Sequence, residues 1–231
     1  MTQAVDLANA INNFVVGCKQ DGIWDPIKAC CIMAAWDGLN GALYPLKGTA
    51  PTNYNFVSGD YNRETGLAGD KSTKYLDSNR ANNADPQNSK HVSVYSTNIT
   101  DSNVIELLMS SSITGVTTGV TMIVANGTND SIVGRANSTQ SSSTSAIYGQ
   151  SFLVAVNRSS SSAIELLVNQ TLTASASTSQ TPNNANINIY GYGGGSSNAR
   201  LAFYSIGESL DLAALDTRVS NLITAIGAAI P

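Results

Sequence analysis

His91, Glu106 and Glu165 stand on predicted strands and have the chemistry of acid–base catalysts. Hydrolysis of a glycosidic bond needs two carboxyl groups that face the same bond, often from alternate positions of one strand. Glu106 and Glu165 each stand alone on a predicted strand, and His91, the one histidine, stands at the head of another. We therefore expect no catalytic residues, and we interpret His91 as the anchor of a neighbouring loop through a hydrogen bond.

A stretch rich in asparagine and aspartate offers oxygen ligands for a cation. Its members are Asp77, Asn79, Asn82, Asn83 and Asp85. Calcium binds carboxylate and amide oxygens of this kind, although the spacing differs from that of an EF-hand loop. The alternative, which we favour, is that these residues form Asx turns and give the loop its structure.

Amides and aromatic rings alternate near the end of the β-rich region. Asn186, Asn188, Tyr190 and Tyr192 occupy alternate positions and would line one face of a sheet. Amides match the hydroxyl groups of sugars, and aromatic rings stack on the apolar faces of sugar rings. The four residues are therefore a candidate glycan-binding patch. The alternative is that they are ordinary solvent-facing strand positions.

The cysteines and the glycine-rich motif indicate neither a metal site nor a cofactor. Cys18, Cys30 and Cys31 are odd in number and lack further ligands at metal-binding spacing, so we interpret them as buried free thiols. The glycine run within 191–195 lacks the spacing of a dinucleotide fingerprint and no helix is expected after it, which favours a flexible turn.

Helical periodicity dominates the beginning of the chain. Residues 3–21 carry apolar side chains at intervals of three and four, which predicts an amphipathic helix. Asp25 and Pro26 are typical of a helix start and predict a second helix to about residue 37. Residues 1–46 would then form a helical hairpin, whose apolar second helix must cover either the β-domain or a neighbouring subunit.

Helical periodicity returns after residue 207. Segment 208–231 has an apolar seam and a cap at Asp211 or Ser209, so it predicts a C-terminal helix. This helix would dock on the sheet or beside the hairpin, or would self-associate as a trimer stem. The apolar residues of the two terminal segments are our candidate assembly contacts: Ile27, Leu212, Leu215, Val219, Leu222 and Ile226.

Residues 47–207 predict one antiparallel β-domain. Alternation of apolar with polar or small residues predicts strands at 105–109, 120–124, 152–156, 164–168, 187–192 and 201–206. The serine-rich stretches 138–145 and 173–180 are interpreted as loops. The fold class is therefore mainly β, with antiparallel sheets packed face to face.

A block of motifs between residues 59 and 95 is similar to a known family. The motifs are Gly59-Asp60-Tyr61-Asn62-Arg63, Gly66-Leu67, residues 72–77, Asn79-Arg80 and residues 91–95. Over residues 40–210 the chain resembles the concanavalin-like (laminin-G-like) jelly-roll modules of bacteriophage structural and tail proteins. The resemblance implies a concanavalin-like β-sandwich and a place in a virion.

Composition narrows the classes of partner. Charged residues make up 12% of the chain, hydrophobic residues 42%, and the net charge is −4 without a basic cluster. These values argue against disorder and against binding to nucleic acid. The sequence contains neither a membrane span nor a secretory signal, so we expect no membrane association and assembly in a host cytoplasm.

These observations and the resemblance together predict a non-enzymatic virion structural protein that forms a homo-oligomer, a trimer among the options, with other virion proteins as partners. We favour a tail-associated or fibre-like adhesin whose jelly roll contacts host surface glycan. A capsid decoration protein is the alternative, and a glycan-processing enzyme is the competing class.

Overall fold

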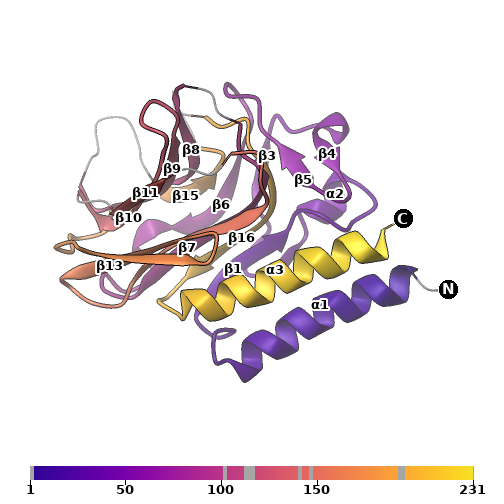
Figure 1. The fold of residues 1–231 in the computed structure, drawn as a ribbon, viewed down its shortest axis with the longest axis horizontal. Helices are drawn as coiled ribbons and strands as arrows, with labels where there is room; N and C mark the ends of the chain where they lie inside the picture. The colour runs from indigo at the N-terminus through magenta and orange to yellow at the C-terminus, as the bar shows by residue number, and fades with distance from the viewer. Residues whose placement is uncertain are drawn as a thin grey trace.

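The protein folds as two antiparallel sheets packed face to face, with two long helices lying side by side against the outer face of one sheet (Figure 1). The computed structural model describes residues 3–100, 103–111, 118–139, 142–145, 148–191 and 196–230. The helices are α1 (Gln3–Gln20) and α3 (Leu212–Ala229). The predicted β-sandwich with an N-terminal and a C-terminal helix is therefore confirmed.

We call the sheet that carries the helices sheet A; its described part has nine strands. Seven of them follow the order β14 (Thr171–Ala176), β13 (Ala163–Val168), β12 (Phe152–Arg158), β7 (Lys90–Asn98), β16 (Arg200–Gly207), β1 (Ile27–Ile32) and β2 (Pro45–Lys47). The short strand β5 (Gly66–Ala68) pairs with β16 and with β4 (Tyr61–Asn62).

The opposite sheet is called sheet B and has seven strands in its described part. Their order is β11 (Ser142–Ser145), β10 (Ser131–Ser138), β9 (Val120–Asn126), β8 (Ile105–Ser110), β15 (Asn186–Ile189), β6 (Tyr75–Ala81) and β3 (Thr52–Tyr54). Short helical turns lie in the connections: α2 (Leu39–Ala42), η1 (Ser58–Asp60) and η2 (Asn82–Ala84).

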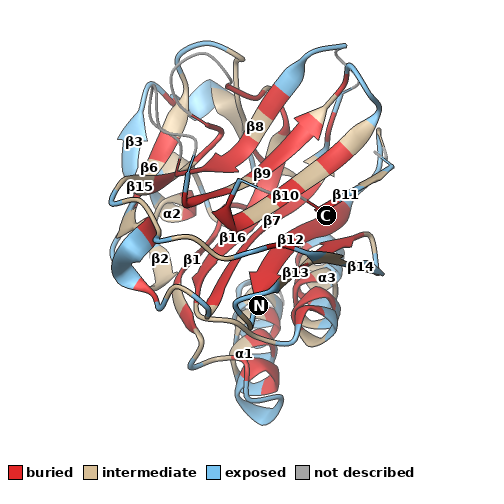
Figure 2. Ribbon diagram, turned by 90° about the vertical axis from the view of Figure 1, so that its left-hand side faces the viewer, coloured by how far each residue is buried: buried red, intermediate tan, exposed pale blue. Residues whose placement is uncertain are grey.

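The central strands of sheet A are buried on both faces, which divides the apolar interior into two cores. Val154 and Val156 of β12 belong to the core between the sheets, whereas Leu153 and Ala155 of the same strand pack against the helices. Figure 2 shows the result as continuous burial along β12, in contrast to the alternation along β10 of sheet B. A strand buried on both faces reads as an unbroken apolar run instead of an alternating one.

Strand β1 corrects the predicted helical hairpin. Residues 27–32, expected in a second helix, form a central strand of sheet A between β16 and β2. Ala29 and Cys31 face the core between the sheets, while Cys30 and Ile32 face the helices. This burial on both faces explains the error, because periodicity alone does not separate a short buried strand from a buried helix.

The candidate assembly contacts are also corrected. Leu212, Leu215, Val219, Leu222 and Ile226 of α3, together with Ile27 of β1, are at most 3% exposed and belong to the core that joins the helices to sheet A. The seam therefore docks α3 on the sheet and beside α1, one of the two arrangements expected. Since these six residues are covered within one chain, they offer no surface to a second copy.

Every predicted strand in the β-domain is present, although β15 ends at Ile189. Other strands were missed or assigned to loops, among them β4, β5, β6, β10, β11 and β14. The serine-rich segments expected to be loops contribute to β11 and β14, where hydroxyl groups stand at the sheet edges: Ser142 Oγ accepts a hydrogen bond from Ser175 Oγ at 3.0 Å. Small hydroxyl side chains tolerate such exposed edges, so low complexity did not exclude strand structure.

The motif block between residues 59 and 95 connects the two sheets. Lys74 Nζ pairs with Asp60 Oδ1 at 2.6 Å, which joins the start of β6 to the turn before β4. Gly66 has a φ of +85°, and a Cβ there would lie 2.0 Å from the carbonyl oxygen of Leu201. Only glycine permits this close approach of β5 to β16.

Candidate functional site

A row of side chains, polar except for Met122, crosses the outer face of sheet B, on the side opposite to the helices. In register from β3 to β10 the row contains Thr52, Asp77, Asn188, Ser110, Met122 and Arg135. The residues next to them along the strands, including Leu76, Ile187 and Ile123, belong to the core between the sheets, so the row faces outward. Five inter-strand steps make it about 24 Å long.

The end of the row near β3 is held by hydrogen bonds between carboxylate and amides. Asp77 Oδ2 accepts from Asn186 Nδ2 at 3.1 Å, and Asp77 Oδ1 accepts from the backbone N–H of Asn79 at 2.7 Å. Asn79 Nδ2 donates to Thr52 Oγ1 at 3.0 Å. The structure thus brings together Asn186 and Asn188 of the predicted patch with Asp77 and Asn79 of the predicted loop. The sequence kept these two groups apart.

Two polar atoms in the row are buried without a hydrogen-bond partner in the described part of the chain. They are the side-chain oxygen of Asn188 and Nε of Arg135. Both side chains are only partly buried as a whole, and the ion pairs among the described residues do not include Arg135. An unpaired buried polar atom costs about 1–3 kcal/mol. Both atoms are closed off from solvent, so they are not themselves exposed to a ligand.

An aromatic pair lies on the same face, two residues further along β3 and β6. Tyr54 and Tyr75 are directly paired across the two strands, and their rings stack with centroids 4.3 Å apart and an interplanar angle of 6°. Tyr54 is 40% exposed. This edge of sheet B therefore offers an ordered, partly exposed aromatic surface next to Thr52 and Asp77.

The part of the face near β10 is more apolar. Leu107, Val124 and Val133 form a second outward row, in register across β8, β9 and β10 beside Met122. Leu107, Met122 and Val133 are half-buried. The outer face of sheet B thus combines an amide and carboxylate region, an aromatic edge and an apolar strip.

Tyr190 does not belong to this face, contrary to the prediction. Strand β15 ends at Ile189, and Tyr190 has a φ of +70°. The side chain of Tyr190 therefore does not continue the alternation between the two faces of the sheet. Its hydroxyl donates to the carbonyl oxygen of Leu67 at 2.6 Å, and its ring packs against Phe56 in the core. Tyr192, the fourth predicted residue, lies outside the described residues.

The candidate calcium ligands are divided between two places. Asp77 and Asn79 lie on strand β6, whereas Asn82 and Asn83 lie in η2, followed by Asp85. The carboxylate of Asp85 is paired with both Arg80 and Lys90, so two cations already compensate its charge. Among the described residues, no group of three or more acidic, histidine or cysteine side chains could hold a metal ion. The arrangement favours the structural interpretation.

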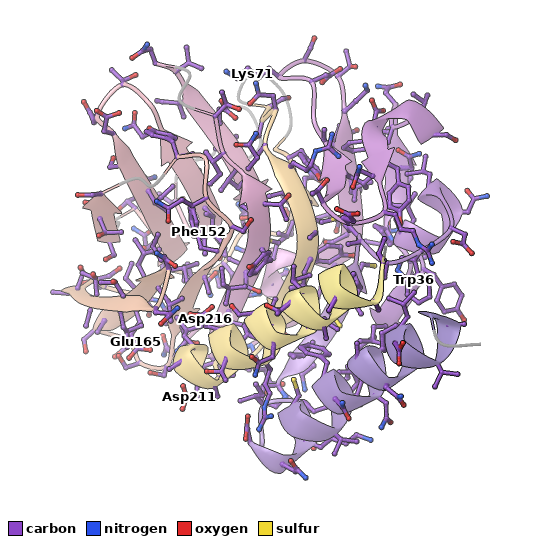
Figure 3. The ribbon with its side chains drawn as sticks, turned by 45° about the vertical axis from the view of Figure 1, so that its right-hand side comes forward. Trp36, Lys71, Phe152, Glu165, Asp211 and Asp216 are labelled. Carbon is purple, nitrogen blue, oxygen red and sulfur yellow. The ribbon has the colours of Figure 1, made fainter. Side chains whose placement is uncertain are left out.

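The two candidate acids do not converge. Glu106 of sheet B is buried, pairs with Lys71 at 2.9 Å and accepts a hydrogen bond from Ser197 Oγ at 2.8 Å. Glu165 of sheet A accepts from Asn157 Nδ2 at 2.9 Å. Figure 3 shows Lys71, the partner of Glu106, near the opposite end of the molecule from Glu165. Each carboxylate is held by its own neighbours, and no bond could lie between the two.

His91 holds a loop, as expected. Its Nδ1 lies 2.6 Å from the carbonyl oxygen of Glu208, and its Nε2 lies 2.9 Å from Ser205 Oγ. The side chain is fully buried, and burial lowers its pKa from 6.5 to about 4. The cysteines also agree with the prediction: all three are free and buried, and burial raises the pKa of Cys31 to about 12.

Sequence reasoning missed Thr52, Tyr54, Tyr75, Ser110 and Arg135 as members of the face. The sequence does distinguish Arg135, because it is the one charged residue of 131–138. Its neighbours Gly134 and Ala136 face inward, so alternation places Arg135 on the outer face. Tyr54 and Tyr75 lie 21 positions apart, and only the pairing of β3 with β6 stacks them.

Comparisons with solved structures identify the fold. The binding domain of botulinum neurotoxin serotype D matches with a TM-score of 0.53 and 11% identity, over 85% of this chain and 50% of that chain. A botulinum neurotoxin type C structure matches with a TM-score of 0.56 and 13% identity, over 87% and 51%. The chain has a concanavalin-like fold. It spans about half the length of these structures.

No family model and no curated protein matches the sequence. At 11–13% identity the structural likeness shows the architecture alone. None of the described helices has the length and hydropathy required to span a membrane.

Proposed function

We propose that this protein is a non-enzymatic, lectin-like module that binds glycan on the outer face of sheet B. The observation that carries the proposal is the outward row that contains Asn188 and Arg135, beside the stacked rings of Tyr54 and Tyr75. A sugar presents hydroxyl donors, oxygen acceptors and apolar ring faces, and each of these has a counterpart on this face.

The length of the row favours an oligosaccharide over a single sugar. Asn188 and Arg135 are three strands apart, which corresponds to about 14 Å, while Tyr54 lies beyond Asn188 on the far edge. A ligand that contacts the aromatic edge, the amide region and Arg135 at once must therefore have several linked units. The apolar strip of Leu107, Val124 and Val133 would lie under the part of the ligand near Arg135.

The fold supports a binding module without specifying its ligand. Entry of botulinum neurotoxin type C into cells depends on interaction with two ganglioside molecules, so a protein of this architecture works with a glycan-bearing partner. The docked helices leave the outer face of sheet B free for such a role, since α1 and α3 pack on sheet A. The separation of Glu106 from Glu165 supports the proposal of binding without hydrolysis.

The virion context of the proposal rests on the sequence resemblance to bacteriophage jelly-roll modules. We propose presentation on a phage particle as a tail-associated or fibre-like adhesin, in several copies, with host surface polysaccharide as the ligand. Several weak sites on one particle would act together, because each bound copy raises the effective concentration of the next.

The test is direct binding of purified bacterial envelope polysaccharides to the full chain, followed by calorimetry on the best ligand. Asn188→Ala and Arg135→Gln should each weaken binding about tenfold, as expected when one buried hydrogen bond is lost. Asn88→Ala is the matched control, since Asn88 is an exposed amide in the turn before β7 of sheet A. Unchanged affinity in both face variants, or release of shorter sugars, would refute the proposal.

A further inference from the structure

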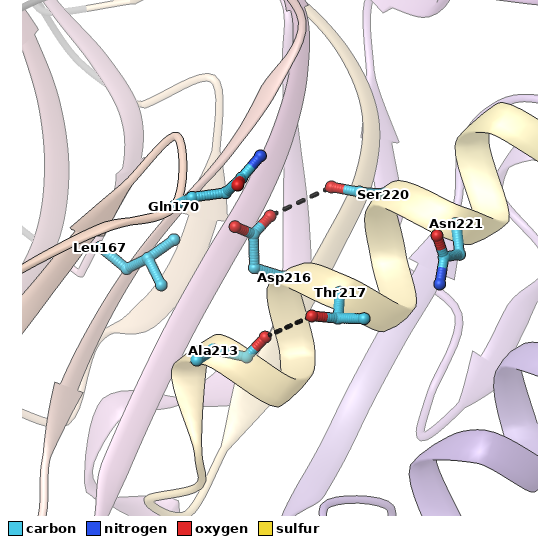
Figure 4. A pocket seen from close by; sticks show the side chains of 7 residues that line it. All are labelled: Leu167, Gln170, Ala213, Asp216, Thr217, Ser220 and Asn221. Carbon is cyan, nitrogen blue, oxygen red and sulfur yellow. Dashed lines mark hydrogen bonds between the residues drawn. The ribbon is translucent and has the colours of Figure 1, made fainter.

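A pocket of about 390 Å³ lies on the helix side of the molecule, between α3 and the turn that joins β13 to β14 (Figure 4). Its wall is formed by Leu167 and Gln170 from the strand pair and by Asp216, Thr217, Ser220 and Asn221 from the helix. Sheet A separates the pocket from the outer face of sheet B, so the two sites are independent.

Asp216 is the charged group of this pocket. It is 5% exposed, and its Oδ1 accepts a hydrogen bond from Ser220 Oγ at 3.1 Å, drawn as a dashed line in Figure 4. The ion pairs of the described residues do not include it. Burial raises the pKa of this carboxyl, while Ser220 and the backbone N–H of Gln170 act in the opposite direction. A buried carboxylate that lacks a cation is costly and gains most from a positively charged partner.

The other groups around the pocket are suited to accept hydrogen bonds. Thr217 Oγ1 donates to the carbonyl oxygen of Ala213 at 3.0 Å, which leaves the lone pairs of the hydroxyl for a ligand. The amides of Gln170 and Asn221 belong to exposed residues at the rim, and Leu167 supplies an apolar wall. An ammonium group has three donors and no acceptor, so this set of acceptors around a carboxylate matches it.

Tyr95 of β7 is the other titratable group near Asp216. Burial raises its pKa, and the charge of Asp216 raises it further. The phenol therefore keeps its proton at neutral and acidic pH and adds no second negative charge. Asp216 alone sets the charge of the pocket in that range.

We propose that this pocket binds a small ligand through a primary ammonium group, which forms an ion pair with Asp216. A neutral polyol is a poorer match, since it would leave the buried charge uncompensated. The ligand class is thus a small organic amine, and the site is distinct from the glycan-binding face proposed above.

Two matched sugars test the proposal on the full chain: glucosamine, which carries an ammonium group, and N-acetylglucosamine, in which acetylation removes that charge. Titrations followed by nuclear magnetic resonance at about pH 6, where the amine is protonated, should show glucosamine binding with shifts in the backbone signals of Asp216 and Asn221. N-acetylglucosamine should bind at least tenfold more weakly. Asp216→Asn should weaken glucosamine binding by a similar factor.

Asp211→Asn is the control, because Asp211 caps the same helix outside the pocket and asparagine caps equally well (Figure 3). The wild-type protein alone supplies a second measurement that needs no variant. Burial raises the pKa of Asp216, so glucosamine binding should weaken as the pH is lowered and this carboxyl gains a proton. Equal binding of the two sugars, binding that Asp216→Asn leaves unchanged, or no binding of glucosamine would each overturn the proposal.

Discussion

Lys90 and Asp85 form an ion pair inside the protein: Nζ lies 3.0 Å from Oδ2, and the two side chains are 0% and 1% exposed. Lys90 also donates to the carbonyl oxygen of Asn82 at 2.6 Å, and Arg80 pairs with the same carboxylate. Burial acts to raise the pKa of Asp85, but the hydrogen bonds and charges of Arg80 and Lys90 outweigh it and lower the pKa. Two of the candidate calcium ligands, Asn82 and Asp85, thus hold the start of β7.

Replacing Asp85 by Asn should reduce the free energy of unfolding by about 3–5 kcal/mol, because Lys90 would remain buried without its counterion. Urea unfolding at neutral pH measures the change. The matched control is Glu208→Gln, which removes the partner of Lys28 in an ion pair whose side chains are 32% and 40% exposed. That change should cost less than about 1 kcal/mol. Equal effects of the two variants would contradict the interpretation.

Acid should destabilise the protein through His91. Its pKa is about 4 in the folded state and near 6.5 when exposed, so the unfolded state binds more protons between these values. The contribution of His91 to the free energy of unfolding is therefore fully present above pH 6.5. It is lost as the pH falls to about 4, and the loss is at most about 3 kcal/mol. Unfolding curves of wild type and His91→Gln across that interval measure the contribution. Parallel pH dependences of the two proteins would show that His91 is not responsible.

Tyr54→Ala should weaken glycan binding about threefold to tenfold, the equivalent of the roughly 0.5–1.5 kcal/mol expected of an aromatic contact. Folding stability should change little, since Tyr54 is 40% exposed. Tyr44→Ala provides the comparison: Tyr44 is 71% exposed and precedes β2 of sheet A. Calorimetry with the polysaccharide identified for the wild type measures the affinities of the two variants. If Tyr54→Ala binds as tightly as Tyr44→Ala, the aromatic edge has no role in binding.

Leu215→Ala should lower the free energy of unfolding by about 2–5 kcal/mol, as truncation of a fully buried leucine leaves a cavity between α3 and sheet A. Thr224→Ala, at an exposed position of the same helix, should stay within about 0.5 kcal/mol. The loss should not depend on protein concentration, because the seam is covered within one chain. An unfolding midpoint that rises with protein concentration would show instead that Leu215 lies at an interface between copies.

The sequence was informative about strands with one solvated face and about the terminal helices, because both give a clear period. It failed where burial removes that period, at β1, and where polar composition hides it, at β11 and β14. Strand β6 was missed for a related reason: Asp77 and Asn79 suggested a loop, yet their side chains point outward and Leu76 and Ser78 are buried.

Only part of the candidate site could be predicted from the sequence. Asn186 and Asn188 stand where the alternation of β15 places them, but the predicted alternation continued past Ile189, where the strand ends, to Tyr190. Asp77 and Arg135 join the same row through pairings between distant strands. Local periodicity cannot supply such pairings, which depend on the strand order of the whole sheet.

The beginning of α1 at Gln3 and the end of α3 at Ala229 lie next to one another in Figure 1, on the layer remote from sheet B. Polypeptide joined to either end would depart from the same corner of the molecule. The protein could therefore be inserted into a loop of a larger protein without disturbing the fold of either, and the outer face of sheet B would stay accessible.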